Sequence, residues 1–154
     1  MTLFERLRRD QRSGSVTTLR SWLRAHPPRP EAFTQTIAGV ATRTTRGEPF
    51  MPAVREFLDE FDLRPPDLRD VAIAERPPST GDPRFDAFLA GLAEHLSLLE
   101  RVDIPLWALE PERFLDRFWF VSDVEGFRAI TLARAPAAFR RRGVLVHPDA
   151  LVRV

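Results

Sequence analysis

The 154-residue chain contains no cysteine, no lysine, no tyrosine and no asparagine. Without cysteine it cannot form a disulfide framework, a thiolate metal site, an iron–sulfur cluster or a thiol nucleophile. No apolar run approaches the roughly 18 residues of a membrane helix, and no charged-then-apolar leader opens the sequence. Because 44% of the residues are hydrophobic and twelve are phenylalanine, the chain can build the core of one domain of about 100–150 residues. We therefore expect a cytoplasmic single-domain protein with no membrane association.

All 23 basic residues are arginine. GC-rich codons explain most of this bias, although the planar guanidinium also suits the recognition of phosphate and carboxylate groups. The net charge of +1 hides an uneven distribution. Residues 1–50 hold nine arginines and four acids, and residues 111–154 hold eight arginines and five acids. Between them, residues 51–110 hold six arginines and thirteen acids. The basic ends either pair with the acidic middle inside the fold or remain as contact surfaces. We favour partial pairing that leaves the ends usable for contacts.

The spacing of apolar residues predicts helices over most of the chain, with prolines marking many of the breaks. In the first half, the expected helices cover residues 2–10, 16–26, 30–43, 52–64 and 68–74. Residues 76–81, Arg-Pro-Pro-Ser-Thr-Gly, are the best linker candidate. This linker separates an N-terminal helical region with a basic start, residues 1–75, from a C-terminal helical region, residues 82–154.

The strongest helix prediction begins at residue 82. Asp82 supplies an N-cap, Pro83 fits the first turn, and apolar residues follow the 3.6-residue period as far as Leu99. Further helices are expected over residues 110–118, 122–135 and 136–142, and a helix restarts at residues 149–151. In the helix over 110–118, the residues expected to face inward are Phe114, Leu115 and Phe118.

Residues 144–146, Val-Leu-Val, form the one convincing strand. A lone strand leaves backbone groups unpaired, so a second strand must lie within residues 102–110 or 119–122, or come from a partner protein. We favour the internal partner, because exposed strand edges are rare. The expected fold class is all-α: a multi-helix single globular domain with one short strand or hairpin near residues 144–147.

The sequence offers few groups for catalysis. Its three histidines have no spacing for a joint metal site, and it contains no P-loop, dinucleotide-binding glycine turn, nucleophile elbow or H-E-x-x-H motif. Two carboxylate pairs could hold a divalent ion, or could simply complement a helix dipole in a first turn: Asp82 with Asp86, and Glu112 with Asp116. We expect a protein that is not an enzyme and that holds no metal and no cofactor.

Arginines beside aromatic residues form a stronger binding pattern. Arg140, Arg141 and Arg142 directly follow Phe139 at a predicted helix end. They either complement the helix dipole as solvated side chains, or bind a partner beside an aromatic anchor. A second arginine cluster is either a solvated face or a contact for nucleic-acid phosphates or an acidic surface: Arg6, Arg8, Arg9 and Arg12.

Several strings of residues carry a resemblance: Glu110-Pro111-Glu112-Arg113-Phe114-Leu115, Phe118-Trp119-Phe120, Gly126-Phe127-Arg128-Ala129, and Ala135-Pro136-Ala137-Ala138-Phe139-Arg140-Arg141-Arg142-Gly143. Together with Thr80-Gly81-Asp82-Pro83-Arg84-Phe85-Asp86, they resemble the C-terminal region of small bacterial antitoxin-like proteins encoded beside nucleotidyltransferase-like toxins. The resemblance covers residues 80–150.

The resemblance implies an antitoxin-like protein that binds and neutralises a cognate toxin, one that transfers nucleotides to RNA or protein. Its partner-binding residues would be Arg128, Phe139, Arg140, Arg141 and Arg142, because guanidinium groups can bind the toxin's metal-binding carboxylates bidentately. Proteins of this kind often carry an N-terminal helix-turn-helix, but prolines 27, 28 and 30 interrupt any such turn here. The alternative is a DNA-binding transcriptional regulator of its own operon, acting through Arg6, Arg8, Arg9 and Arg12.

Overall fold

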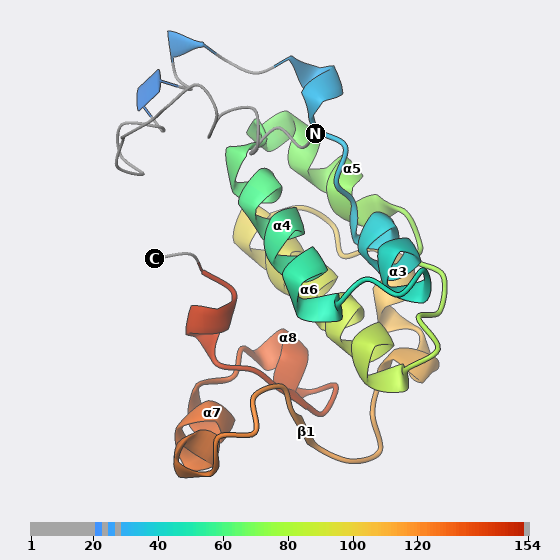
Figure 1. Cartoon of the computed structure of the whole chain (residues 1–154), viewed down its shortest axis with the longest axis vertical. Coiled ribbons are helices and arrows are strands. Elements are labelled where there is room, and N and C mark those ends of the chain that lie inside the picture. The colour runs from blue at the N-terminus through green and yellow to red at the C-terminus, as the bar shows by residue number, and fades with distance from the viewer. Residues whose placement is uncertain (1–20, 23–24, 27–28, 153–154) are drawn as a thin grey trace.

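The computed structural model describes residues 21–22, 25–26 and 29–152. The expected helix over residues 2–10, most of the expected helix over 16–26, and the cluster of Arg6, Arg8, Arg9 and Arg12 lie outside the described residues. The described chain is mainly helical with one two-stranded sheet, so the expected all-α class with a short strand is confirmed. Figure 1 shows α3 to α6 side by side as a bundle, with the C-terminal elements grouped beside it.

The α-helices of the described chain are α3 (Ile37–Thr45), α4 (Phe50–Leu63), α5 (Arg69–Ala74), α6 (Pro83–Glu100), α7 (Arg128–Arg134) and α8 (Ala137–Arg140). Short 3-10 helices are η1 (Pro30–Ala32), η2 (Pro66–Leu68), η3 (Leu106–Leu109), η4 (Pro111–Arg113), η5 (Glu125–Phe127) and η6 (Pro148–Ala150). The strands are β1 (Trp119–Phe120) and β2 (Val144–Leu145).

Helix α6 is the central element of the fold. It begins where the sequence predicts, because the side chain of Asp82 accepts a hydrogen bond from the backbone N–H of Arg84 at 2.9 Å and Pro83 occupies the first turn. Ten of its 18 residues are buried, more than one apolar stripe can supply. It therefore packs against α3 and α5 and also against α8 and β2.

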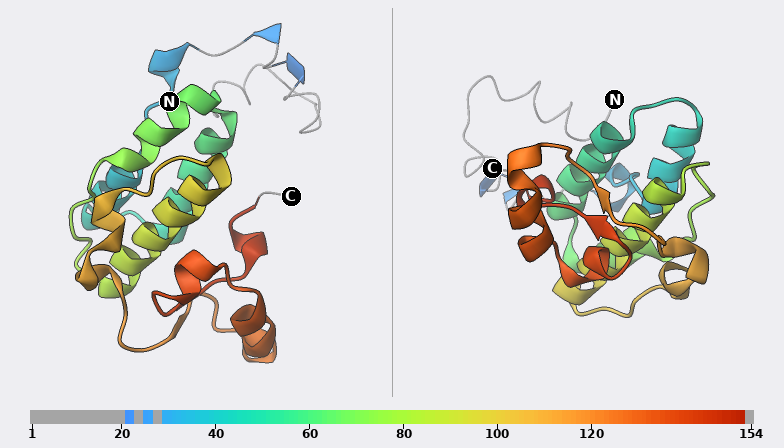
Figure 2. Two further views of the ribbon diagram at one scale, coloured as in Figure 1. Left: turned by 180° about the vertical axis from the view of Figure 1, so that it is seen from behind. Right: turned by 90° about the horizontal axis from the view of Figure 1, so that it is seen from below.

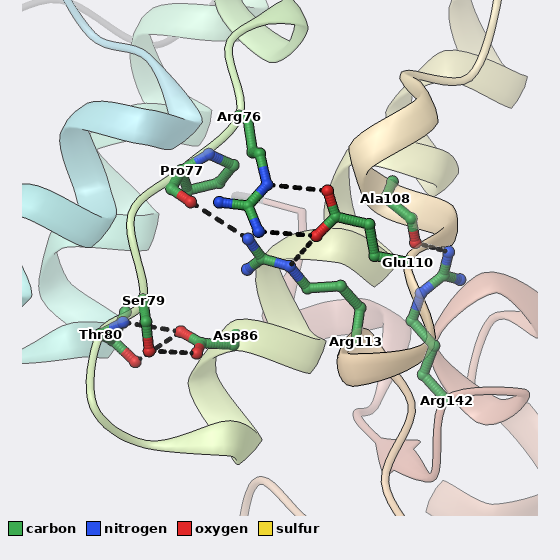
Figure 3. Close-up of polar contacts among 9 residues, drawn as sticks. All are labelled: Arg76, Pro77, Ser79, Thr80, Asp86, Ala108, Glu110, Arg113 and Arg142. Atoms are coloured by element: carbon green, nitrogen blue, oxygen red, sulfur yellow. Dashed lines mark hydrogen bonds and ion pairs between the residues drawn. The ribbon is translucent and has the colours of Figure 1, made fainter.

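One apolar cluster contains residues from α3, α4, α5 and α6 together with Phe139, Val144 and Val146. The two regions on either side of residues 76–81 therefore share a single core. Residues 76–81 are themselves held in place: Arg76 donates to both carboxylate oxygens of Glu110 at 2.7 and 2.8 Å, and the carbonyl of Pro77 accepts from Arg113 at 3.1 Å (Figure 3). The expected linker is thus a fixed connection across the surface of the bundle.

The helix predicted over residues 30–43 is wrong in its first half. Only η1 and α3 form, and residues 33–36 between them are not helical. The carboxylate of Glu60 accepts from the backbone N–H groups of Thr34 and Gln35, which holds this segment against α4. The hydroxyl of Thr36 then caps α3 by accepting from the N–H of Gly39 at 2.9 Å.

The helix predicted over residues 110–118 is also wrong. The chain leaves the helical conformation after η4, because its backbone N–H groups bond to a distant segment. The N–H of Leu115 donates to the carbonyl of Arg142 at 2.9 Å, and the N–H of Trp119 donates to the carbonyl of Gly143 at 2.8 Å. Phe118, expected to face inward, is 68% exposed. Tertiary hydrogen bonding has overridden the local helical pattern here. The helices predicted over 122–135 and 136–142 exist in shorter form, as η5 with α7 and as α8.

The partner of the predicted strand lies within the same chain. β1 and β2 pair in parallel, with Trp119 opposite Val144 and Phe120 opposite Leu145. The partner lies in residues 119–122, one of the two internal segments that we favoured, so this expectation is confirmed. The pair brings α7 and α8, which lie between its strands in the sequence, to the same side of the bundle as β1 (Figure 2).

Candidate protein-interaction site

The three consecutive arginines after Phe139 have three different environments. Arg142 and Phe139 are fully buried, the side chain of Arg141 is about half exposed, and Arg140 is exposed. Phe139 packs against the ring of Phe88, with the ring centroids 5.1 Å apart. The expectation that Phe139 and Arg142 contact a partner is therefore corrected: both are enclosed within the folded chain, where a docking protein does not reach them.

Arg142 connects four segments of the fold. Its Nη1 donates to the carboxylate of Glu94 on α6 and, at 2.7 Å, to the carbonyl of Ala138 on α8. Its Nη2 donates to the carbonyl of Ala108 on η3 at 2.7 Å (Figure 3). The guanidinium also lies over the ring of Phe114, 4.7 Å from the ring centroid. Burial lowers the pKa of Arg142, and the bond to Glu94 opposes that lowering.

Glu94 also binds Arg141. The Nε and Nη2 atoms of Arg141 donate to Glu94 Oε2 at 3.0 and 2.7 Å, so one carboxylate holds two guanidinium groups. Two of the three arginines are thus occupied within the chain. Among the contacts of the described residues, the side chain of Arg140 makes no hydrogen bond or ion pair, so it is the member of the run whose guanidinium a partner can reach without competition.

Sequence reasoning missed the buried arginines. Arg64, Arg113 and Arg142 are buried, and each has one guanidinium nitrogen without a hydrogen-bond partner among the described residues. Each also lies over an aromatic ring, within 5.6 Å of its centroid: Arg64 over Phe33, Arg113 over Trp107 and Arg142 over Phe114. A ring face attracts a cation where no acceptor is available. No signal in the sequence distinguishes these three arginines from the exposed ones, because their burial depends on residues distant in the chain.

Arg128 lies at the surface. It forms an ion pair with Asp123, and its guanidinium lies 5.3 Å from the centroid of the Phe120 ring on β1. About half of its side chain is exposed. Of the five residues expected to bind a partner, the structure therefore leaves Arg128, Arg140 and part of Arg141 accessible.

Arg128 begins helix α7, which presents its apolar side to solvent. Thr131 is the only buried residue of this helix. Because successive residues are about 100° apart around an α-helix, Ala129 and Ala133 lie opposite Thr131, with Ile130 and Leu132 on either side of them. Ile130 and Leu132 are 45% and 42% exposed. A helix on the surface of a globular protein ordinarily has the reverse arrangement.

Two more exposed apolar residues precede the helix. Val124 and Phe127, which belong to the segment leading into the helix, are 52% and 60% exposed. We call the outward side of the helix the α7 face: Ala129, Ile130, Leu132 and Ala133. Figures 1 and 2 show α7 at the edge of the molecule, apart from the bundle of α3 to α6. The apolar surface is therefore accessible to a partner.

The described chain does not gather groups for metal binding. No cluster of three or more histidine or acidic residues in these parts of the chain could hold an ion. Asp82 binds Arg84, while Asp86 accepts hydrogen bonds from Ser79 and Thr80 (Figure 3). Glu112 and Asp116 do not share a helix, because η4 ends at Arg113.

One pocket in the described structure is an open hollow of about 750 Å³ between α5 and residues 101–107. Most of its lining is apolar, and its charged members are Asp70, Arg101 and Asp103. None of the histidines lines this hollow.

No helix in the described ranges combines the length and the apolarity that crossing a bilayer requires. The chain matches no protein-family model, no curated protein and no solved structure.

Proposed function

We propose that this chain is an antitoxin-like protein that binds and neutralises a nucleotidyltransferase-like toxin through direct protein–protein contact. The observation that carries the proposal is the α7 face, a helix whose solvent-facing side is apolar. The face lies within residues 80–150, the part of the sequence that bears the resemblance to antitoxin-like proteins. Exposed apolar surface of this kind marks interaction sites.

Exposed arginines on α7 and at the end of α8 suit the proposed partner. Nucleotidyl transfer depends on acidic residues that hold metal ions, and a guanidinium binds a carboxylate through two parallel hydrogen bonds. Arg134 and Arg140 are exposed, and the described contacts give neither an ion pair. They and Arg128, which pairs with Asp123, are the accessible arginines of this region, whereas Arg142 of the expected partner-binding run is buried.

The proposal is tested with the product of the neighbouring open reading frame. Co-expression should yield a stable complex that survives size-exclusion chromatography. Adding the purified chain in stoichiometric amount should abolish nucleotide transfer by the partner. Unchanged transfer activity at equimolar or higher concentration of the chain would contradict the proposal.

The alternative, a DNA-binding regulator, rests on Arg6, Arg8, Arg9 and Arg12, which lie outside the described residues. It predicts affinity for the upstream promoter fragment that falls steeply as salt is raised, because phosphate contacts release counterions. A titration without detectable binding at low salt would remove it.

A further inference from the structure

We draw no further inference here: the strongest candidate, the open and mainly apolar hollow between α5 and residues 101–107, carries charges of both signs at Asp70, Arg101 and Asp103, and nothing in the described structure shows what covers it.

Discussion

Replacing Glu94 by glutamine should destabilise the fold strongly. The side chain of Arg142 is 0% exposed and that of Glu94 is 8% exposed, so the substitution leaves a buried guanidinium without its counter-charge. Breaking a buried ion pair in this way costs about 3–5 kcal/mol. The loss should lie near the lower end, about 3 kcal/mol, because glutamine keeps one acceptor oxygen and Arg142 keeps two carbonyl partners. The loss of the ion pair between Glu94 and Arg141 adds little to the destabilisation, since the side chain of Arg141 is 46% exposed.

The measurement is equilibrium unfolding in urea, followed by circular dichroism at neutral pH, with a thermal melt beside it. For a chain of this length, a loss of 3 kcal/mol should lower the Tm by roughly 6–12 °C. The double variant Glu94→Leu with Arg142→Met should recover most of the stability, because an apolar pair can replace a buried ion pair at little cost. The matched control is Glu48→Gln, which removes an exposed partner of Arg43 and should cost less than about 1 kcal/mol. A loss for Glu94→Gln no larger than that of the control would refute the reasoning.

Two further substitutions probe the contact between α6 and the C-terminal elements. Gly91→Ala should destabilise the fold by about 1–3 kcal/mol although alanine is the better helix former, because the new Cβ would lie 2.8 Å from Cδ1 of Phe139; Gly126→Ala, where no atom lies within 4 Å, is the control, and equal urea midpoints for the two would contradict the prediction. Burial lowers the pKa of His95, so the unfolded chain binds this proton at higher pH than the folded protein does. The contribution of His95 to stability should therefore be intact above about pH 6.5 and decline as the pH falls through that value. His95→Gln should reduce the difference between urea denaturation curves recorded at about pH 7.5 and pH 5.5, and an unchanged difference would count against this assignment.

Local signals predicted α6 well. Asp82 and Pro83 mark its start, and the apolar period continues to its last turn, so each signal agrees with the position of the helix in the fold. The strand at residues 144–146 was predicted for a similar reason, because a short run of β-branched and aliphatic residues follows a glycine that can turn the chain. Its partner could be narrowed to two internal segments from the rule that strand edges are paired.

Tertiary contacts determined what the sequence could not predict. Residues 114–121 have helical apolar spacing, yet backbone bonds to Arg142 and Gly143 draw them into an extended path. The arginine run could not be divided into buried and exposed members, because that division depends on Glu94, which lies 47 and 48 residues earlier in the chain. The apolar outer side of α7 was hidden for the same reason. Helical spacing shows that a face exists, and only the packing of Thr131 shows which face turns inward.

The bond between Glu94 and Arg142 also bears on the order of events during synthesis. The two residues are 48 positions apart, so at roughly 5–20 residues per second the ribosome takes about 2–10 s to supply the second after the first. Throughout that interval, neither Arg141 nor Arg142 is available to pair with Glu94, and the ring of Phe139 is not yet available to pack beside Gly91. The shared core therefore cannot be completed until residues 139–146, which contribute Phe139, Val144 and Val146 to it, have been synthesised.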